Sequence, residues 1–365
     1  MERMSAEDVR FILENALRAP SGDNTQPWRW VVRGNVFELW NESSDEPLHT
    51  LYSSSQDNSQ ASHLSFGAAI ENAVIAATVR NYRTDVFYFP DPVQPLLVAR
   101  LVFVIDSAIT ADSLGQTLSK RVTNRKTYRR KPLQPEERAR LIGSSPHEGS
   151  EGIKLIDDRA SVNELAAIAS LHDELIFSTK GLHHYVFAHI NWTKREDARR
   201  RIGFYFPTLA APPCTWGFMQ IIRHWWVMRI GIALGLHRVI ALEQQFVYRQ
   251  SGAYGIVLTK GDTPTDWIEA GRQVERLWLT ATSMGLSVHP LNGTLLLALS
   301  LNTEAGQHFF SLQQQDRLRE GRRKIASLFS VEDKRIAFMF RIGHGKPPAA
   351  RTSRLPLEKV VTFAS

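Results

Sequence analysis

The chain has 365 residues, 43% of them hydrophobic and 22% charged, which is enough for one large domain or two smaller domains with buried cores. Its net charge of +7 favours an anionic partner, but it does not distinguish nucleic acid, lipid and a phosphorylated small molecule. The single cysteine, Cys214, excludes an internal disulfide and a metal site built from cysteines.

Neither the N-terminal residues nor the apolar stretches predict membrane insertion. The first ten residues lack the apolar run of a signal peptide, and arginines and histidines interrupt the longest apolar stretch, 218–242. A lone cysteine also suits a reducing compartment. We therefore expect a cytoplasmic protein with no membrane partner.

The first third of the chain predicts an alternation of helices and paired strands. The expected order is a helix capped by Ser5, strands at 28–32 and 36–40, a buried helix at 64–79, and strands at 85–89 and 101–105. Gly34 lies between the first two strands, where it favours a hairpin turn.

A similar order returns in the rest of the chain. The expected elements are a helix at 134–142, a strand at 153–156, a long helix at 267–284, and strands at 287–291 and 335–342. The two buried helices carry matching glycines, Gly67 and Gly271. This order predicts an internal duplication, with an N-terminal half at 1–115 and a C-terminal half at 116–365.

The C-terminal half contains an insertion at about 160–255 that is rich in aromatic residues, namely Trp192, Phe204, Tyr205, Phe206, Trp216, Phe218, Trp225 and Trp226. Two interpretations remain open. The insertion is either an extra helical layer packed on the core or a cap over a cofactor, since an insertion into one copy covers only one of two equivalent faces.

The segment 120–131, KRVTNRKTYRRK, holds seven lysines and arginines among its twelve residues. A nucleic-acid or heparin patch is one interpretation, although Tyr128 is its only aromatic residue. A solvated charged loop is the second. The third is a phosphate cradle, in which Arg121 and Arg125 share one face of a helix and Thr123 adds a hydroxyl donor.

Three motifs together resemble the FMN-dependent nitroreductase family. They are the turn at 19–28 (APSGDNTQPW), the sequence Arg121-Val122-Thr123-Asn124-Arg125, and the segment Arg354-Leu355-Pro356-Leu357. The chain is most similar to the long single-chain members related to the mycobacterial protein Acg. The resemblance implies an α+β fold of the nitroreductase type, with a central, mostly antiparallel sheet flanked by helices and duplicated internally as a pseudo-dimer.

The resemblance also implies one FMN per chain. Arg121 and Thr123 would hold the phosphate and ribityl chain, and Arg125 would lie near N1 and O2 of the isoalloxazine, where a fixed positive charge raises the reduction potential. Val122 departs from the family, which usually has a second arginine at this position. The N-terminal half lacks a counterpart of this motif, so its equivalent site would lack phosphate ligands.

Other segments would complete the implied cofactor site. The turn would touch the edge of the flavin, the tail would bind the phosphate, and the loop after Gly285 would present backbone amides toward N5. Besides the residues above, the implied set contains Asn124, the turn residues Pro20, Ser21, Gly22, Asn24 and Gln26, the loop residues His289, Pro290 and Leu291, and the tail residues Arg351 and Arg354.

The implied activity is electron transfer from NADH or NADPH to a small organic acceptor, without a proton-transferring side chain that we can name. The alternative is a protein that stores or sequesters FMN under a closed lid. A third option, a tailoring enzyme for one hydrophobic metabolite, requires an insertion that lines an open pocket. We expect a monomer that mimics a dimer and could pair further, with neither nucleic acid nor a metal ion as partner.

Overall fold

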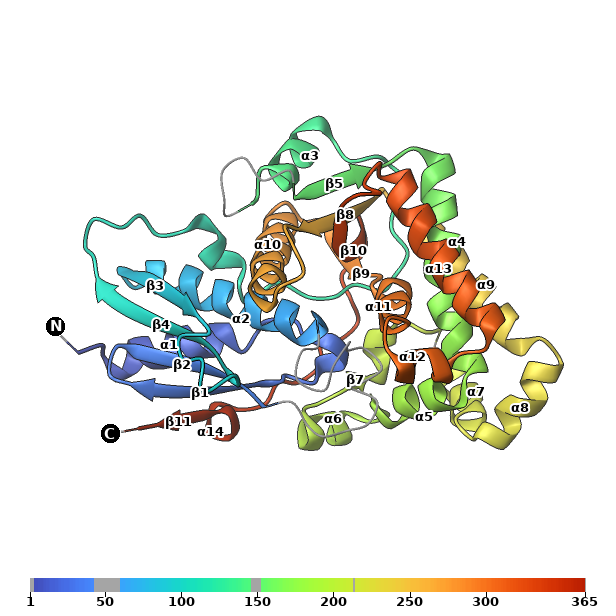
Figure 1. The fold of residues 1–365 in the computed structure, drawn as a ribbon, viewed down its shortest axis with the longest axis horizontal. Coiled ribbons are helices and arrows are strands. Elements are labelled where there is room, and N and C mark those ends of the chain that lie inside the picture. Colours follow the sequence, from blue (N-terminus) through green and yellow to red (C-terminus); the bar gives the residue numbers. More distant parts are fainter. Residues whose placement is uncertain (1–2, 43–59, 146–151, 213, 365) are drawn as a thin grey trace.

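The computed structural model describes residues 3–42, 60–145, 152–212 and 214–364. Two β-sheets lie to either side of two long helices, α2 (Gln60–Val79) and α10 (Pro264–Ser283), which cross at the centre of the molecule (Figure 1). Antiparallel pairing dominates both sheets. The fold is therefore α+β, as the resemblance implies.

The N-terminal half follows the predicted order closely. Its elements are α1 (Ala6–Ala16), β1 (Trp28–Arg33), β2 (Val36–Asn41), α2, β3 (Tyr82–Tyr88) and β4 (Leu97–Ile105). Ser5 caps α1, because its hydroxyl accepts a hydrogen bond from the Asp8 backbone N–H. Gly34 has a φ of +56° in the hairpin between β1 and β2, a conformation that disfavours other residues.

The C-terminal half has a second sheet. Its elements are α3 (Pro135–Ile142), β5 (Ile153–Ile156), β8 (Ala253–Thr259), α10, β9 (Ser287–Pro290) and β10 (Arg335–Gly343). The strand order is β5-β8-β10-β9, and the first sheet contains the corresponding order β1-β2-β4-β3. The sequence analysis missed β8, which is buried along its whole length and therefore shows no alternation of polar and apolar residues.

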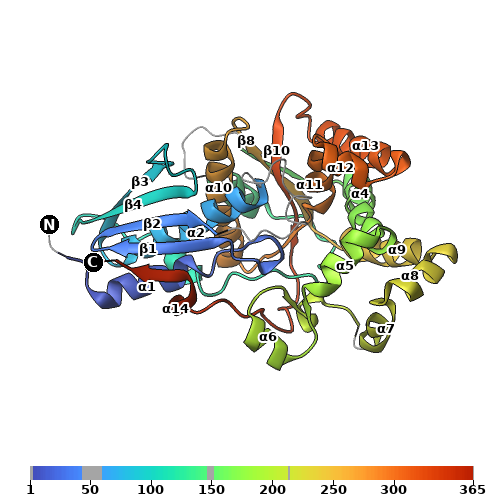
Figure 2. The ribbon, with the colours of Figure 1, turned by 60° about the horizontal axis from the view of Figure 1, so that its bottom comes forward.

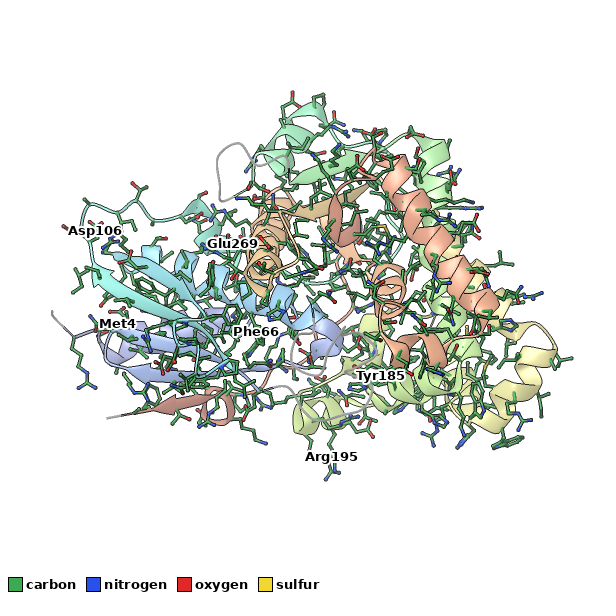
Figure 3. The ribbon with its side chains drawn as sticks, viewed as in Figure 1. Met4, Phe66, Asp106, Tyr185, Arg195 and Glu269 are labelled. Atoms are coloured by element: carbon green, nitrogen blue, oxygen red, sulfur yellow. The ribbon has the colours of Figure 1, made fainter. Side chains whose placement is uncertain are left out.

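The two crossing helices meet at their matched glycines. A Cβ atom on Gly67 would overlap the Ile268 carbonyl oxygen, and one on Gly271 would overlap the Leu64 carbonyl oxygen. The contacts are reciprocal, because each glycine lies against the residue three positions before the other glycine. Figure 3 labels Phe66 and Glu269, which lie on these helices beside the crossing. Only glycine permits so close an approach of the two backbones.

The insertion supplies a group of helices at one end of the molecule (Figure 2). Its elements are α4 (Arg159–Ser178), α5 (Lys180–Ala188), β6 (Ile190–Asn191), α6 (Lys194–Arg200), β7 (Phe204–Tyr205), α7 (Thr215–Ile222), α8 (Trp225–Ala233) and α9 (Leu236–Arg249). Phe177, Phe187, Phe206, Ile222 and Met228 form its own apolar core. Most of the insertion is thus an additional helical layer.

Helices α11 (Gly293–Ser300), α12 (Glu304–Phe309) and α13 (Leu312–Leu328) lie between β9 and β10 in the sequence. Helices α4, α11 and α13 cover the second sheet, where Leu165 of α4, Leu295 of α11 and Ile325 of α13 share one apolar cluster with the strand residue Ile256. The sequence analysis did not predict α11, α12 and α13.

The tail returns to the N-terminal half. After the short helix α14 (Leu357–Val360), β11 (Val361–Phe363) pairs in parallel with β1 and becomes an edge strand of the first sheet. This return brings Arg351 and Arg354 beside the end of α1, although more than 330 residues separate them along the chain.

Among the described helices, none is individually long and apolar enough to cross a membrane. Helices α8 and α9 satisfy the length and composition criteria only as a pair, and they are bent by 86° relative to each other.

Candidate functional site

A cavity of about 160 Å³ lies where the end of α1, the basic segment, the insertion and the tail meet. Its lining residues are Arg18, Pro20, Ser21, Asn24, Leu118, Ser119, Arg121, Val122, Thr123, Arg125, Phe204, Thr208, Ala350, Arg351, Thr352 and Arg354. Five of these residues are arginines, and none is an aspartate or glutamate. The lining therefore favours an anionic ligand.

The basic segment contains no helix, so the expectation that Arg121 and Arg125 share a helical face is wrong. The Arg121 N–H still donates to the Thr117 carbonyl at 3.1 Å, but later backbone N–H groups of the segment donate to distant parts of the chain. The Asn124 N–H donates to the Val288 carbonyl at 3.0 Å, and the Tyr128 N–H donates to the Gln250 carbonyl at 2.9 Å. Both arginines still reach the same cavity.

Arg121 is buried against a carboxylate that sequence reasoning missed. Its Nε lies 3.1 Å from Oε1 of Glu275 on α10, and its guanidinium stacks 4.7 Å from the ring centre of Trp278. Nη2 donates to the Arg18 carbonyl at 2.7 Å, which ties the segment to the end of α1. Burial raises the pKa of Glu275 to about 7, and Arg121 partly opposes that rise.

The tail arginines also line the cavity. Arg354 donates to the Asn24 side chain and to the Ala19 carbonyl, the latter at 3.3 Å. Burial and then the neighbouring cation Arg121 lower the pKa of Arg354 to about 9. Arg351 donates to the carbonyls of Ser119 and Lys120 at 2.6 and 2.5 Å. The two tail arginines and Arg121 repel one another, so a bound anion would relieve their repulsion.

Arg125 lies at the insertion side of the cavity. Its guanidinium is 5.0 Å from the ring centre of Phe204, and Nη1 donates to the Thr208 carbonyl at 3.3 Å. Burial lowers the pKa of Arg125. The fully buried Arg341 of β10 holds the adjoining backbone, because its Nη2 donates to the Arg125 carbonyl at 3.0 Å.

The turn at 19–28 is fastened to both the insertion and the tail. Asn24 Nδ2 donates to the carbonyls of Gly203 and Ser353 at 3.2 and 3.1 Å. Gln26 Nε2 donates to the Arg201 carbonyl at 2.7 Å, and its Oε1 accepts from the Leu355 N–H at 2.9 Å. Asn24 and Gln26 both have positive φ values, of 57° and 54°. These two side chains position three segments of the chain.

The structure thus brings together nine of the predicted site residues, namely Pro20, Ser21, Asn24, Arg121, Val122, Thr123, Arg125, Arg351 and Arg354. Six others do not line the cavity, namely Gly22, Gln26, Asn124, His289, Pro290 and Leu291. The assignment of all fifteen to a cofactor stays a prediction.

His289 is turned toward the interior beside the cavity. Its Nδ1 accepts a hydrogen bond from Arg341 Nε at 3.1 Å, so the opposite ring nitrogen carries the proton of the neutral ring. Burial and then the charge of Arg341 hold the pKa of His289 well below its usual range. The ring of His172, from the insertion, packs directly on Gly293, just after this loop.

Sequence reasoning also missed Arg18, Thr208, Glu275 and Arg341. Arg18 and Thr208 belong to no recognisable motif. The ion-pair partner of Glu275 is 154 residues away in the sequence, and the hydrogen-bond partners of Arg341 lie between 52 and 216 residues away. In the described part of the chain, no group of three or more histidine, cysteine, aspartate and glutamate side chains could hold a metal ion.

Comparison with known proteins connects this chain to nitroreductases. It is 25% identical over 352 residues to an uncharacterised protein of Mycobacterium tuberculosis strain CDC 1551, covering 94% of this chain and 47% of that protein. It is 36% identical over 126 residues to Rv3131, a candidate NAD(P)H nitroreductase of M. tuberculosis H37Rv, covering 34% of this chain and 35% of that protein. The chain is related to the nitroreductase-like proteins. The resemblance stated from its motifs is thereby confirmed.

These matches cover less than half the length of either relative. No protein-family model matches the chain. A candidate nitroreductase from Anabaena variabilis superposes with a TM-score of 0.46 at 11% identity, covering 95% of this chain and 90% of that chain. The arrangement of this chain therefore follows from its own strand order and contacts, and not from this superposition.

Proposed function

We propose that this nitroreductase-like chain binds FMN in the five-arginine cavity and transfers electrons from NADH or NADPH to a small organic acceptor. The observation that carries the proposal is the convergence of Arg18, Arg121, Arg125, Arg351 and Arg354 on one cavity that no carboxylate lines. A phosphate monoester is dianionic near neutral pH and accepts hydrogen bonds from several guanidinium groups at once.

The residues present fit such a group at its phosphate end. Arg121 is held by Glu275 and Trp278 and cannot swing away, so it supplies a fixed cation. Arg351 and Arg354 are flexible in principle, but their bonds to backbone carbonyls orient them toward the same cavity. FMN, when bound, supplies the hydride and electron chemistry, and the chain supplies position and charge.

Arg125 is the cation that we assign to the ring of the cofactor. Its guanidinium lies between Phe204 and the Thr208 carbonyl, and Arg341 holds its backbone by donating a hydrogen bond to the Arg125 carbonyl. A buried guanidinium stabilises negative charge more strongly than one in water does, because the surrounding dielectric is low. Arg125 would therefore favour the reduced, negatively charged state of a nearby acceptor group.

We also propose that the chain is an internal duplication in which two halves meet as a pseudo-dimer. The matching strand order of the sheets and the reciprocal contacts at Gly67 and Gly271 support it. In a two-fold symmetric contact, residue i touches j and j touches i, which is the pattern at this crossing. A cytoplasmic location and a monomeric state remain predictions from the sequence.

The alternative, an FMN-storing protein, has one specific observation in its favour. The insertion supplies Phe204 and Thr208 to the cavity wall, and Asn24 and Gln26 bind the backbone of the insertion. At about 160 Å³ the cavity is smaller than the several hundred Å³ typical of ligand sites. An insertion fastened in this way would restrict entry of a nicotinamide donor.

The experiment has two stages on the full chain. FMN is first titrated into apo-protein by calorimetry, with the R121A/R354A variant as the test and R195A/R199A, two exposed arginines of α6, as the matched control. We expect the first variant to lose at least about 100-fold in affinity, since each charge-assisted contact contributes about 1.5–3 kcal/mol. Equal affinity of both variants would overturn the cofactor assignment.

The second stage mixes the FMN-loaded protein with NADH or NADPH without oxygen and follows the flavin absorbance. Bleaching within seconds supports the reductase. A flavin that is bound tightly but is not reduced over an hour would support storage instead. A substitution that loosens the insertion, Gln26→Ala, then distinguishes a closed lid from an absent donor site, because only a lid would yield reduction in the variant.

A further inference from the structure

The helices α7, α8 and α9 expose an unusual share of large apolar side chains. Among the residues that the structure describes, nine of the seventeen exposed large hydrophobic residues lie within 216–246. We call these nine the apolar corner: Trp216, Phe218, Ile221, Trp226, Ile230, Leu234, Val239, Leu242 and Phe246. The three helices lie together at the end of the molecule farthest from the first sheet (Figures 1 and 2).

The exposed residues recur at one-turn intervals. Trp226 and Ile230 are 68% and 57% exposed and lie four residues apart on α8, and Leu234 follows after four more. Val239, Leu242 and Phe246 form a similar stripe on α9. The opposite faces of the same helices are also apolar and are buried, as at Met228 and Ala241. The corner is therefore an unpartnered apolar surface in addition to a complete core.

The charges around the corner are almost all positive. Residues 214–250 include four arginines, Arg223, Arg229, Arg238 and Arg249, which are all exposed, and one acidic residue, Glu243. A symmetric contact with a second copy of this chain would bring these arginines together with few counter-charges, and like charges at an interface are unfavourable. A complementary partner therefore has an apolar interior, which receives the apolar corner, and a negatively charged surface, which meets the arginines.

We propose that the apolar corner docks on the surface of an anionic lipid bilayer. Trp226, Ile230 and Leu234 lie among the headgroups and upper acyl chains, and the arginines contact lipid phosphates. Tryptophan and arginine are the residues that favour this interfacial layer. Because α8 has only nine residues and the α8–α9 pair is bent by 86°, the helices lie on the membrane and do not span it.

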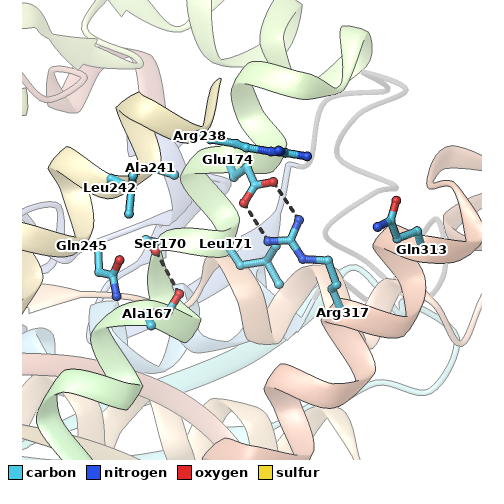
Figure 4. A pocket seen from close by; sticks show the side chains of 10 residues that line it. All are labelled: Ala167, Ser170, Leu171, Glu174, Arg238, Ala241, Leu242, Gln245, Gln313 and Arg317. Atoms are coloured by element: carbon cyan, nitrogen blue, oxygen red, sulfur yellow. Dashed lines mark hydrogen bonds and ion pairs between the residues drawn. The ribbon is translucent and has the colours of Figure 1, made fainter. Parts of the chain in front are cut away.

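A polar recess opens beside the corner and offers room for a lipid headgroup. It has a volume of about 450 Å³ and lies between α4, α9 and α13 (Figure 4). Glu174 and Arg317 neutralise each other in it through two bonds of 2.7 Å each. Leu242 of the apolar corner and the nearby Arg238 also line this recess. Because Glu174 and Arg317 pair with each other, Arg238 gives the recess a net positive charge.

The test is sedimentation of the full chain with vesicles of phosphatidylcholine alone or mixed with phosphatidylglycerol. We expect binding to the anionic vesicles that weakens as salt increases. The variant W226S/I230S should bind them about tenfold more weakly or worse. Its matched control is F87S/V93S, which removes exposed apolar residues of 52% and 85% exposure from the N-terminal half. The control should bind as the unmodified chain does.

A second pair of variants tests the charge independently. R223E/R229E should abolish the preference for anionic vesicles, whereas R195E/R199E on α6 should retain it; Figure 3 labels Arg195 on that helix. Equal binding of W226S/I230S and its control would overturn the proposal. So would light scattering that shows a dimer of the unmodified chain becoming monomeric in W226S/I230S, because the corner would then join two copies.

If the vesicles do bind, the sequence-based expectation of no membrane partner needs correction at this surface. The result does not depend on the proposed FMN site, since no residue of the corner lines the five-arginine cavity. Apo-protein and FMN-loaded protein should bind vesicles alike, which separates a failure of this inference from a failure of the proposed function.

Discussion

Two glutamates at matched positions on the crossing helices have different surroundings. Glu71 follows Gly67 by four residues on α2, and Glu275 follows Gly271 by four residues on α10; both are buried. Glu71 accepts from Arg272 Nε at 2.7 Å and from Arg276 Nη1 at 2.8 Å. Within the described residues, Glu275 forms one ion pair, with Arg121 at 3.1 Å.

The two matched positions differ in the balance of charge around the carboxylate. Around Glu71 the positive charges are neutralised, because Arg276 also pairs with Asp112 at 2.9 Å. Around Glu275 the arginines outnumber the carboxylates, and five arginines line the adjoining cavity. The first arrangement stabilises the contact between α2 and α10, and the second has the unneutralised cations that we propose for the ligand.

The largest contrast should appear on removing each negative charge. Glu71→Gln should lower the free energy of unfolding by about 3 kcal/mol at pH 7, because it removes the buried carboxylate that Arg272 and Arg276 share and leaves them only their second partners, Glu269 and Asp112. Glu275→Gln should cost less than about 1 kcal/mol, because a carboxyl with a pKa of about 7 is already half protonated. Urea denaturation of both variants measures the contrast, and equal losses would contradict it.

A smaller contrast should appear in the pH dependence of stability. Burial raises the folded-state pKa of Glu275 from 4.5 to about 7, so the folded chain binds more protons than the unfolded chain between these values. The free energy of unfolding should therefore fall as pH rises through this range, by about 3 kcal/mol for this group. In the Glu275→Gln variant, this pH-dependent fall in the free energy of unfolding should be absent.

Asp173 is the control for that measurement. Burial also raises its pKa to about 7, with its carboxylate accepting from the Tyr248 hydroxyl at 2.9 Å. The contribution of Asp173 to the pH dependence of the free energy of unfolding should persist in Glu275→Gln and disappear in Asp173→Asn. An unmodified chain whose stability is constant from pH 4.5 to 7 would contradict both assignments.

The crossing of the two helices should be equally sensitive from either side. Gly67→Ala and Gly271→Ala each place a methyl group on a backbone carbonyl, so each should cost about 1–3 kcal/mol. Gly217→Ala in α7 is the matched control, because a Cβ there meets nothing within 4 Å and should be neutral or slightly stabilising. A large difference between the two crossing variants would contradict the reciprocal contact.

The smallest effect is expected at the helix starts. Ser5→Ala removes the hydroxyl that caps α1 and should cost about 1 kcal/mol, measured as a shift of the thermal midpoint. In the second half, Glu137 accepts from the Gln134 N–H at 2.8 Å at the start of α3, so Glu137→Ala should cost a similar amount. A cost near zero for Ser5→Ala would show that packing alone defines this end.

Local signals in the sequence predicted much of the fold. Ser5, Gly34 and the small residues around Gly67 act through nearest neighbours, and the elements that they predict are present. β8 was missed because a strand that is buried on both faces lacks the alternation that identifies strands. The helical expectation for Arg121 and Arg125 failed because β9 competes for the backbone hydrogen bonds of that segment.

The site was predictable as far as its residues belong to motifs. Arg121, Arg125 and Arg354 could be named, and they do line one cavity. The pairing of Arg121 with Glu275 could not be predicted, since an ion pair between residues 154 positions apart leaves no pattern in the sequence. The same is true of Phe204, whose place in the wall depends on how the whole insertion folds back.

The pairing of β11 with β1 has a consequence for synthesis of the chain. Val361 lies opposite Trp30 in the sheet, so the first strand waits for its neighbour until residue 361 has left the ribosome. The arginines at 351 and 354 arrive in the same late interval. Nascent chains that are stalled before that point should present an uncovered edge at Trp30, where chaperones or a second nascent chain could pair with it.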